Sequence, residues 1–114
     1  MALSPEMRTR LESDVKNNDV VLYMKGTSDF PMCGFSARAA QVLKASGVKF
    51  QDFNILEDDN LRVSLKEFSE WPTFPQCYIK GEFIGGSDIL LEMYESGELQ
   101  KKLEGVPKAQ PART

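Results

Sequence analysis

The run of five apolar residues at 20–24 constrains the fold more than any other feature of this 114-residue sequence. A short run that is apolar at every position predicts a strand buried on both faces of a sheet. A polar loop over 25–29 follows, and then a helix is predicted over 34–45. One face of that helix is apolar: Phe35, Ala39, Val42 and Leu43. A buried strand followed by an amphipathic helix favours an α/β fold that begins with a parallel βαβ unit.

The segments on either side of this unit supply its other elements. A first helix begins after Ser4, a predicted N-cap, with Pro5 at the first helical position. Apolar and polar residues alternate over 48–53, which predicts a half-exposed second strand. Another helix follows Asp58, and its predicted inner face is Leu61, Leu65 and Phe68.

The sequence pattern of the C-terminal half predicts a β-hairpin followed by a last helix. Strands at 77–79 and 83–84 flank a tight turn, and the last helix is predicted to turn four residues inward: Ile89, Leu90, Met93 and Tyr94. We expect one domain over residues 1–106, with a mixed four-stranded sheet flanked by helices on both faces. The Pro/Ala-rich segment 107–114 predicts a disordered tail.

The absence of histidine excludes several kinds of active site. Without an imidazole the chain has no Ser-His-Asp or Cys-His catalytic pair and no His-ligated zinc. The net charge of −3, with no clustered basic run, carries no signature of nucleic-acid binding. The two cysteines, Cys33 and Cys77, are too few for a four-thiolate zinc or iron–sulfur site within one chain.

The sequence also limits the cellular compartments in which we expect the protein. No apolar run is long enough to span a membrane, and the N-terminus lacks the pattern of a secretory signal. A chain with no disulfide framework suits a reducing compartment. We therefore expect a cytoplasmic protein, or one in a mitochondrial or plastid matrix if a transit peptide has been removed.

Cys33 is the leading candidate for chemistry. It lies just before the predicted helix 34–45, where free N–H groups and the helix dipole stabilise a thiolate. Cys33 is therefore a candidate nucleophile or metal ligand, and the alternative is a small buried thiol without reactivity. A dithiol redox motif has its second cysteine three residues on, where this chain has Ser36. Cys33 therefore has no resolving thiol in its own loop.

Polar groups in other loops could bind a small ligand beside Cys33. Two cations, Lys25 and Arg62, a helix N-terminus with a carboxylate at 86–88, and the backbone of Phe74 would suit a peptide with two carboxylates, one amine and one thiol. Glutathione fits that description. Each residue also has a simpler interpretation. Lys25 and Arg62 could be solvated surface cations, and Asp88 could be an acidic residue of the first helical turn that the helix dipole stabilises. The nearby Trp71 is expected to pack in the core or in its loop.

Four motifs carry a resemblance to a known family. They are Met24-Lys25-Gly26, Cys33-Gly34-Phe35-Ser36, Trp71-Pro72-Thr73-Phe74-Pro75-Gln76 and Gly85-Gly86-Ser87-Asp88. In this order and spacing they resemble the monothiol glutaredoxins, in particular the single-domain members, over residues 4 to 105. Many relatives have cysteine where this chain has Ser87. The second cysteine of this chain, Cys77, is expected to be a packed core or strand thiol. The alternative is a disulfide with Cys33, which would need the two Cα atoms to lie within about 7 Å.

The resemblance implies a thioredoxin fold with Pro75 in the cis form. It implies that Cys33 is both the catalytic thiol and a metal ligand, and that glutathione is bound by six residues: Lys25, Arg62, Phe74, Gly86, Ser87 and Asp88. It further implies a 2Fe-2S cluster that bridges two subunits, with Cys33 of each subunit and two glutathione thiols as ligands. The cluster-bound form would be a homodimer and the apo form a monomer, with BolA-type proteins and iron–sulfur recipient apoproteins as partners.

Three functions remain open at this point. The first is a 2Fe-2S carrier that delivers its cluster in iron–sulfur protein maturation. The second is an enzyme, a glutathione-dependent oxidoreductase in which Cys33 alone attacks protein–glutathione mixed disulfides. The third is an adaptor whose cysteine is incidental.

Overall fold

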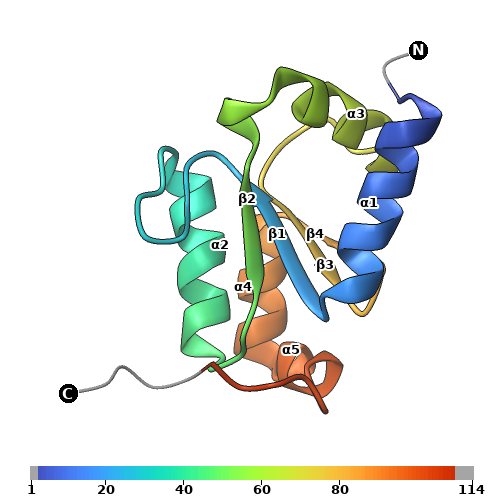
Figure 1. Ribbon diagram of the computed structural model, residues 1–114. Coiled ribbons are helices and arrows are strands. Elements are labelled where there is room, and N and C mark those ends of the chain that lie inside the picture. Colours follow the sequence, from blue (N-terminus) through green and yellow to red (C-terminus); the bar gives the residue numbers. More distant parts are fainter. Residues whose placement is uncertain (1–2, 110–114) are drawn as a thin grey trace.

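Four strands form one mixed sheet in the order β2-β1-β3-β4 (Figure 1). The computed structural model describes residues 3–109. The strands are β1 (Val20–Met24), β2 (Gln51–Asn54), β3 (Gln76–Ile79) and β4 (Glu82–Gly85). The central strand β1 runs parallel to β2 and antiparallel to β3, so that Val21 lies opposite Gln51 on one side and Tyr78 on the other. The predicted parallel unit and hairpin are both confirmed, although β2 begins three residues later than predicted.

Helices cover both faces of this sheet (Figure 1). The helices are α1 (Pro5–Asn17), α2 (Gly34–Ala45), α3 (Asp59–Ser69), α4 (Ser87–Ser96) and the short α5 (Glu98–Lys102), with a 3-10 turn η1 (Ile55–Glu57) before α3. Helices α2 and α4 pack on one face, and α1 and α3 pack on the other. Helix α2 has the predicted bounds, and Ser4 caps α1 as predicted. Within residues 3–109 no helix has the length and apolarity needed to cross a membrane.

Strand β1 lies between two apolar cores. All five of its residues are buried, and their side chains alternate between the faces. Val20, Leu22 and Met24 join the core under α2 and α4, whereas Val21 and Tyr23 join the core under α1 and α3. The uninterrupted apolar run at 20–24 is thus explained, because each face of the strand has its own helix layer.

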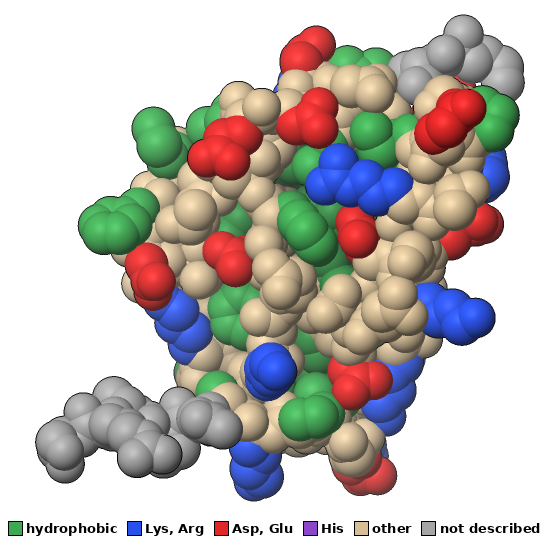
Figure 2. Space-filling model, in the orientation of Figure 1, with side chains coloured by type: hydrophobic (Ala, Val, Ile, Leu, Met, Phe, Trp, Pro, Cys, Tyr) green, Lys and Arg blue, Asp and Glu red, His purple; other side chains and the backbone are tan. Residues whose placement is uncertain are grey.

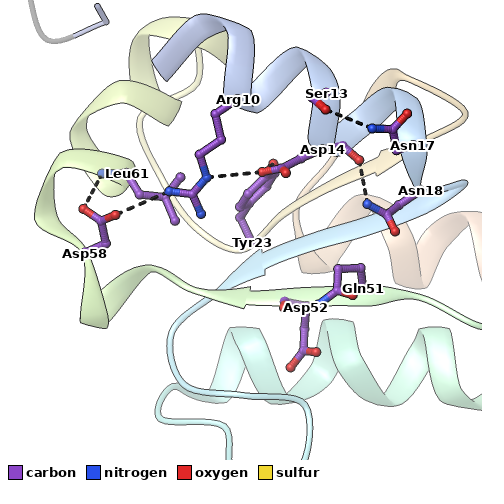
Figure 3. Close-up of polar contacts among 10 residues, drawn as sticks. All are labelled: Arg10, Ser13, Asp14, Asn17, Asn18, Tyr23, Gln51, Asp52, Asp58 and Leu61. Atoms are coloured by element: carbon purple, nitrogen blue, oxygen red, sulfur yellow. Dashed lines mark hydrogen bonds and ion pairs between the residues drawn. The ribbon is translucent and has the colours of Figure 1, made fainter. Parts of the chain in front are cut away.

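A polar network links α1 to β1 and to the start of α3 (Figure 3). The Arg10 guanidinium lies 3.6 Å from the Asp14 carboxylate and 3.4 Å from that of Asp58. The second oxygen of Asp58 accepts the Leu61 N–H and thereby caps α3, while the Tyr23 hydroxyl donates to Asp14 at 3.3 Å. Burial raises the pKa of Asp14, against the opposing charge of Arg10. The network fixes the N-terminus of α3 relative to the sheet.

Three predicted inward residues are exposed instead. Phe35 and Ile89 are 57% and 42% exposed, and each lies in the first turn of its helix. Helical spacing places these residues on the apolar face, but their turns lie at the rim of the cleft described below rather than over the sheet. Tyr94 is 36% exposed because the buried stripe of α4 is centred on Leu90 and Met93, and Tyr94 lies at its margin.

The structure differs from the prediction at the C-terminal segment 107–114. Residues 107–109 run antiparallel to residues 47–49, with the Lys49 N–H donating to the Pro107 carbonyl at 2.9 Å. Backbone pairing of this kind needs no apolar side-chain pattern, so side-chain periodicity does not predict it. The rest of the predicted tail lies outside the described residues.

The order βαβ followed by ββα around one mixed sheet is the thioredoxin fold. The peptide bond between Phe74 and Pro75 is cis, as the family resemblance implied. Two helix N-termini, those of α2 and α4, and the loop 71–75 meet beyond the carboxyl end of β1. This is the end at which open α/β sheets bind their ligands.

Candidate functional site

A cleft of about 720 Å³ lies at the junction of these elements. It gathers segments that are far apart in the sequence: the end of β1, the first turns of α2 and α4, helix α3 and the loop 71–75. All seven residues that the sequence singled out line this cleft: Lys25, Cys33, Arg62, Phe74, Gly86, Ser87 and Asp88. The structure therefore brings the whole predicted set together around one thiol.

Cys33 occupies the N-cap position of α2 and is half-buried. The backbone N–H of Ser36 is the main cause that lowers the pKa of the Cys33 thiol. Burial opposes this effect, while the Phe35 N–H, the charge of Lys25 and the Ser36 hydroxyl add to it. Cys33 is thus favoured as a thiolate, the form that acts as nucleophile and metal ligand.

Ser36 has a structural role that its place in the motif did not reveal. Its side chain is fully buried, and its hydroxyl oxygen accepts the Lys25 N–H at 3.0 Å. The hydroxyl therefore ties the end of β1 to the first turn of α2. The position that holds the second thiol of a dithiol motif is thus used here to fix the loop around Cys33.

Cys77 contrasts with Cys33. It lies on β3 with no exposed surface, inside the apolar core under α2 and α4. Burial raises the pKa of the Cys77 thiol to about 12. Both cysteines are free thiols. The prediction that Cys77 is a packed strand thiol is confirmed.

One wall of the cleft carries positive charge. Arg62 of α3 donates from Nε and from a terminal nitrogen to one oxygen of Asp59, at 3.0 and 2.7 Å. Lys25 follows β1 directly and is half-buried. Lys66, one helical turn after Arg62, also lines the cleft, and sequence reasoning missed it. The four-residue spacing from Arg62 on α3 was the signal that could have found it.

The opposite wall is the N-terminus of α4. Gly86 is its N-cap residue, and a Cβ at this position would lie 3.3 Å from the Pro75 carbonyl oxygen. Ser87 is 5% exposed, whereas Asp88 is exposed and lies 3.6 Å from Arg38 of α2. The first N–H groups of a helix lack intrahelical acceptors, so this wall offers donors to an anion next to a carboxylate.

The loop between the walls is held by Gln76. The side chain of Gln76 is fully buried, and its amide nitrogen donates to the carbonyls of Trp71 and Thr73, at 3.1 and 3.2 Å. These bonds fix the loop that presents Phe74. Trp71 was expected to pack, and its ring does contact that of Phe83, with ring centroids 6.2 Å apart. Trp71 is also 45% exposed, however, and it lines the cleft.

Asn54 holds the loop that precedes Cys33. Its side-chain oxygen accepts the N–H groups of Gly26 and Leu56, at 2.9 and 3.0 Å. Gly26 has a φ of +88°, and a Cβ there would lie 2.5 Å from the Phe30 carbonyl oxygen, so only glycine fits. Asn54 thereby connects the Lys25 side of the cleft to the turn that leads into α3.

Apolar side chains are exposed beside the cleft. Figure 2 shows hydrophobic side chains protruding over the loop that precedes α2, where Phe30 and Met32 are 79% and 70% exposed. Across residues 3–109 no three His, Cys, Asp or Glu side chains come together as a metal site. Among the residues that line this cleft, Cys33 is the one that carries a thiol able to bind a metal.

Comparison with known proteins assigns this chain to a family. The model of the family described as Glutaredoxin matches residues 20–84. Probable monothiol glutaredoxin 2 of Rickettsia felis is 54% identical over 95 residues, which cover 83% of this chain and 91% of that protein. The chain belongs to the monothiol glutaredoxin family. In this chain Ser36 lies where a dithiol motif has its second cysteine, so Cys33 is the single thiol of its loop.

Two further relatives are longer than this glutaredoxin. Monothiol glutaredoxin-S14, chloroplastic, of Arabidopsis thaliana is 57% identical over 103 residues, which span 90% of this chain and 60% of that protein. Monothiol glutaredoxin-5, mitochondrial, of Schizosaccharomyces pombe is 51% identical over 96% of this chain and 77% of its own length.

Solved structures agree with the fold of this glutaredoxin. The solution structure of reduced poplar apo GrxS14 superposes with a TM-score of 0.80 at 56% identity, over 91% of this chain and 95% of that chain. A monomeric truncated mutant of Trypanosoma brucei 1-C-Grx1 gives a TM-score of 0.81 at 40% identity, over 91% and 96% of the two chains. Both comparisons support the sheet order and the placement of the helices.

Proposed function

We propose that this glutaredoxin binds glutathione in the Cys33 cleft and carries a 2Fe-2S cluster as cargo, which it delivers in iron–sulfur protein maturation. The observation that carries the proposal is the cleft itself. It brings a thiol with a lowered pKa together with six groups suited to glutathione, and no second thiol lies in the Cys33 loop.

Each part of glutathione has a partner of suitable chemistry. The ammonium and carboxylate of its γ-glutamyl end suit Asp88 and the N–H groups at the start of α4. The backbone of Phe74 suits pairing with the peptide in the middle, next to Cys33. The glycine carboxylate then extends to the basic wall of α3 and Lys25.

The cluster would be shared between two chains. A 2Fe-2S cluster is held by four thiolate-type ligands, and one chain supplies only Cys33. Two chains and two glutathione thiols complete the set, so the cluster-bound form is a homodimer and the apo form a monomer. The exposed Phe30, Met32 and Phe35 beside Cys33 offer apolar contact area for a second chain. Because half of the ligands are dissociable, the cluster is suited to transfer.

The proposed partners are iron–sulfur recipient apoproteins and BolA-type proteins. Two relatives carry the words chloroplastic and mitochondrial in their names. We place this chain in the cytoplasm or in an organelle matrix of that kind, and targeting of the native gene product with a fluorescent fusion tests the assignment.

Anaerobic reconstitution tests the proposal. The chain is incubated with iron, sulfide and glutathione, and the absorption spectrum and molecular size are measured on the same sample. We expect a cluster spectrum on a dimer that dissociates when glutathione is removed, and neither in Cys33→Ser. Cys77→Ser is the matched control, because its thiol is buried away from the cleft. A colourless monomer under all conditions would overturn the carrier function.

A second function is favoured by the same lowered pKa of Cys33. In this oxidoreductase the Cys33 thiolate attacks the glutathione sulfur of a protein–glutathione disulfide and releases the protein thiolate. A second glutathione thiolate then attacks the Cys33–glutathione disulfide, which yields oxidised glutathione and restores the Cys33 thiolate. Turnover of a glutathionylated peptide coupled to glutathione reductase measures this activity. Undetectable turnover with normal glutathione affinity would exclude it.

A further inference from the structure

The methionines within residues 3–109 differ sharply in exposure. Met24 and Met93 are 0% and 7% exposed in the core under α2 and α4, and Met7 packs half-buried against the other core. Met32, which directly precedes Cys33, is 70% exposed. Oxidation of a thioether requires access of the oxidant to its sulfur. Met32 is therefore the methionine of this region that is most open to oxidation.

The loop holds Met32 in this exposed position. The Met32 N–H donates to the Lys25 carbonyl at 2.9 Å. A Cβ at Gly26 would lie 2.7 Å from Cγ of Met32, so the stem of the Met32 side chain packs against Gly26. Asp52 of β2 anchors the same loop, because its carboxylate accepts the Ser28 N–H at 2.8 Å. The exposure of Met32 therefore lies mainly at its thioether end, beyond the packed stem.

The polarity of Met32 matters because of its neighbours. Phe30 and Phe35 are 79% and 57% exposed on either side of it along the chain, and Cys33 follows it directly. In the proposed carrier these apolar side chains provide contact area for a second chain around the shared cluster. A thioether is apolar and adaptable, which suits such a contact. A sulfoxide is polar and would lose its hydration there.

We propose that Met32 is a reversible oxidation site whose sulfoxide weakens the pairing of two chains around the cluster. The effect on pairing rests on the proposed carrier function, whereas the oxidation itself does not. The oxidant is a hydroperoxide: a lone pair of the Met32 sulfur attacks one peroxide oxygen, the O–O bond breaks, and water or an alcohol leaves. The sulfur is oxidised by two electrons and the peroxide is reduced. In a methionine sulfoxide reductase two thiols restore the thioether and yield one disulfide and water.

Graded oxidation with hydrogen peroxide tests the site itself. Cys33 is first blocked as a methyl disulfide, which a dithiol reductant later removes without reducing a sulfoxide. Mass spectrometry of timed digests then follows each methionine. We expect Met32 to be oxidised at least about tenfold faster than Met24 and Met93, with rates that converge in denaturant. Equal rates in the folded chain would overturn the assignment.

A second measurement tests the effect on pairing. Oxidised and untreated chains are unblocked and reconstituted anaerobically with iron, sulfide and glutathione. Sedimentation at several protein concentrations then gives the dissociation constant of the cluster-bound dimer. We expect oxidation to weaken the dimer about tenfold, because the sulfoxide is desolvated at the contact. Treatment with a methionine sulfoxide reductase should reverse the loss.

Two variants assign the effect to one side chain. Met32→Leu keeps an apolar side chain that cannot form a sulfoxide, so its dissociation constant should be the same with and without peroxide. Met7→Leu is the matched control, because Met7 lies on α1 against the opposite core. Its dimer should weaken on oxidation as that of the unaltered chain does.

The outcomes separate this inference from the function on which it rests. If the oxidised chain pairs as tightly as the untreated chain, the effect assigned to Met32 is wrong while the carrier function stands. A loss that persists in Met32→Leu would also overturn it, because another group would then be responsible. If the untreated chain forms no cluster-bound dimer, the carrier function is overturned, and the role of the Met32 sulfoxide with it.

Discussion

Cys33 and Cys77 have the same side chain in opposite surroundings. Cys33 caps the N-terminus of α2, half-buried in a cleft with cations on one wall, and backbone N–H groups lower its pKa. Cys77 lies on β3 among apolar side chains, and burial raises its pKa to about 12. The difference follows from placement alone, since a helix terminus has unpaired donors and a packed strand has none.

The comparison explains why one thiol suits chemistry and the other suits packing. A thiolate needs N–H groups or cations near the sulfur, and at Cys33 the junction between a loop and a helix start supplies them. Ser36 strengthens the contrast, because its buried hydroxyl fixes that junction instead of adding a second thiol.

The largest expected effect is on alkylation. In the folded chain at pH 7, iodoacetamide should modify Cys33 more than about a thousandfold faster than Cys77. A pKa of about 12 leaves Cys77 almost entirely protonated, and the surrounding core blocks access. Mass spectrometry of timed digests measures both rates, which should converge in denaturant. Similar rates in the folded chain would show that Cys77 is accessible.

The free energy of unfolding should depend on Cys77 more than on Cys33. Cys77→Ser is expected to lower the free energy of unfolding by about 1–3 kcal/mol, because a hydroxyl in the apolar core lacks the partners it has in water. Cys33→Ser should change it by less than about 0.5 kcal/mol, since that site is half-exposed. Urea unfolding of both variants makes the comparison, and equal losses would refute it.

Alkaline pH should reveal the buried thiol. The unfolded thiol ionises near its ordinary value of 9.0, whereas folded Cys77 ionises only near 12. Between these values the unfolded chain binds fewer protons, so stability falls as pH rises, by up to about 1.4 kcal/mol per unit. Below pH 9 this contribution is constant. Cys77→Ala should lose this part of the slope between pH 9 and 10, below the range in which the buried Tyr78, with its pKa raised to about 12, adds a slope of the same sign. An unchanged slope between pH 9 and 10 in that variant would contradict the assignment.

The smallest effect concerns Ser36. Ser36→Ala removes the hydroxyl that supports the Cys33 thiolate, and the pKa of Cys33 should rise slightly. The rise is limited because the Ser36 N–H, the main cause of the lowered pKa, remains. Thiolate absorbance against pH measures the shift, with Ser46→Ala at the other end of α2 as control. A lowered or unchanged pKa of Cys33 would show that the Ser36 hydroxyl does not stabilise the thiolate.

Local patterns predicted most of the fold. The apolar run of β1, the spacing within α2 and the cap at Ser4 are each recorded in neighbouring residues, and each is confirmed. The errors at Phe35 and Ile89 have one cause. Helical periodicity shows which face is apolar, but it does not show that the first turn lies beside a cleft instead of the core.

The site was predictable only in part. Cys33, Arg62 and Asp88 stand out by residue type and position, and the structure brings them to one cleft. The supports of that cleft were missed, because Asn54 and Gln76 bond to backbone groups that no periodicity marks. Such contacts depend on how the loops fold, which the sequence pattern does not specify.

The most direct test of the account is an NMR titration of the isotopically labelled chain with reduced glutathione under anaerobic conditions. The account predicts that shifted backbone amides cluster at the cleft, in residues 25, 33–36, 73–74 and 86–88. Amides at the opposite end of the sheet, around Asn17 and Lys49, should not move. No shifts at saturating glutathione, or shifts centred away from Cys33, would contradict the claim that this cleft is the glutathione site.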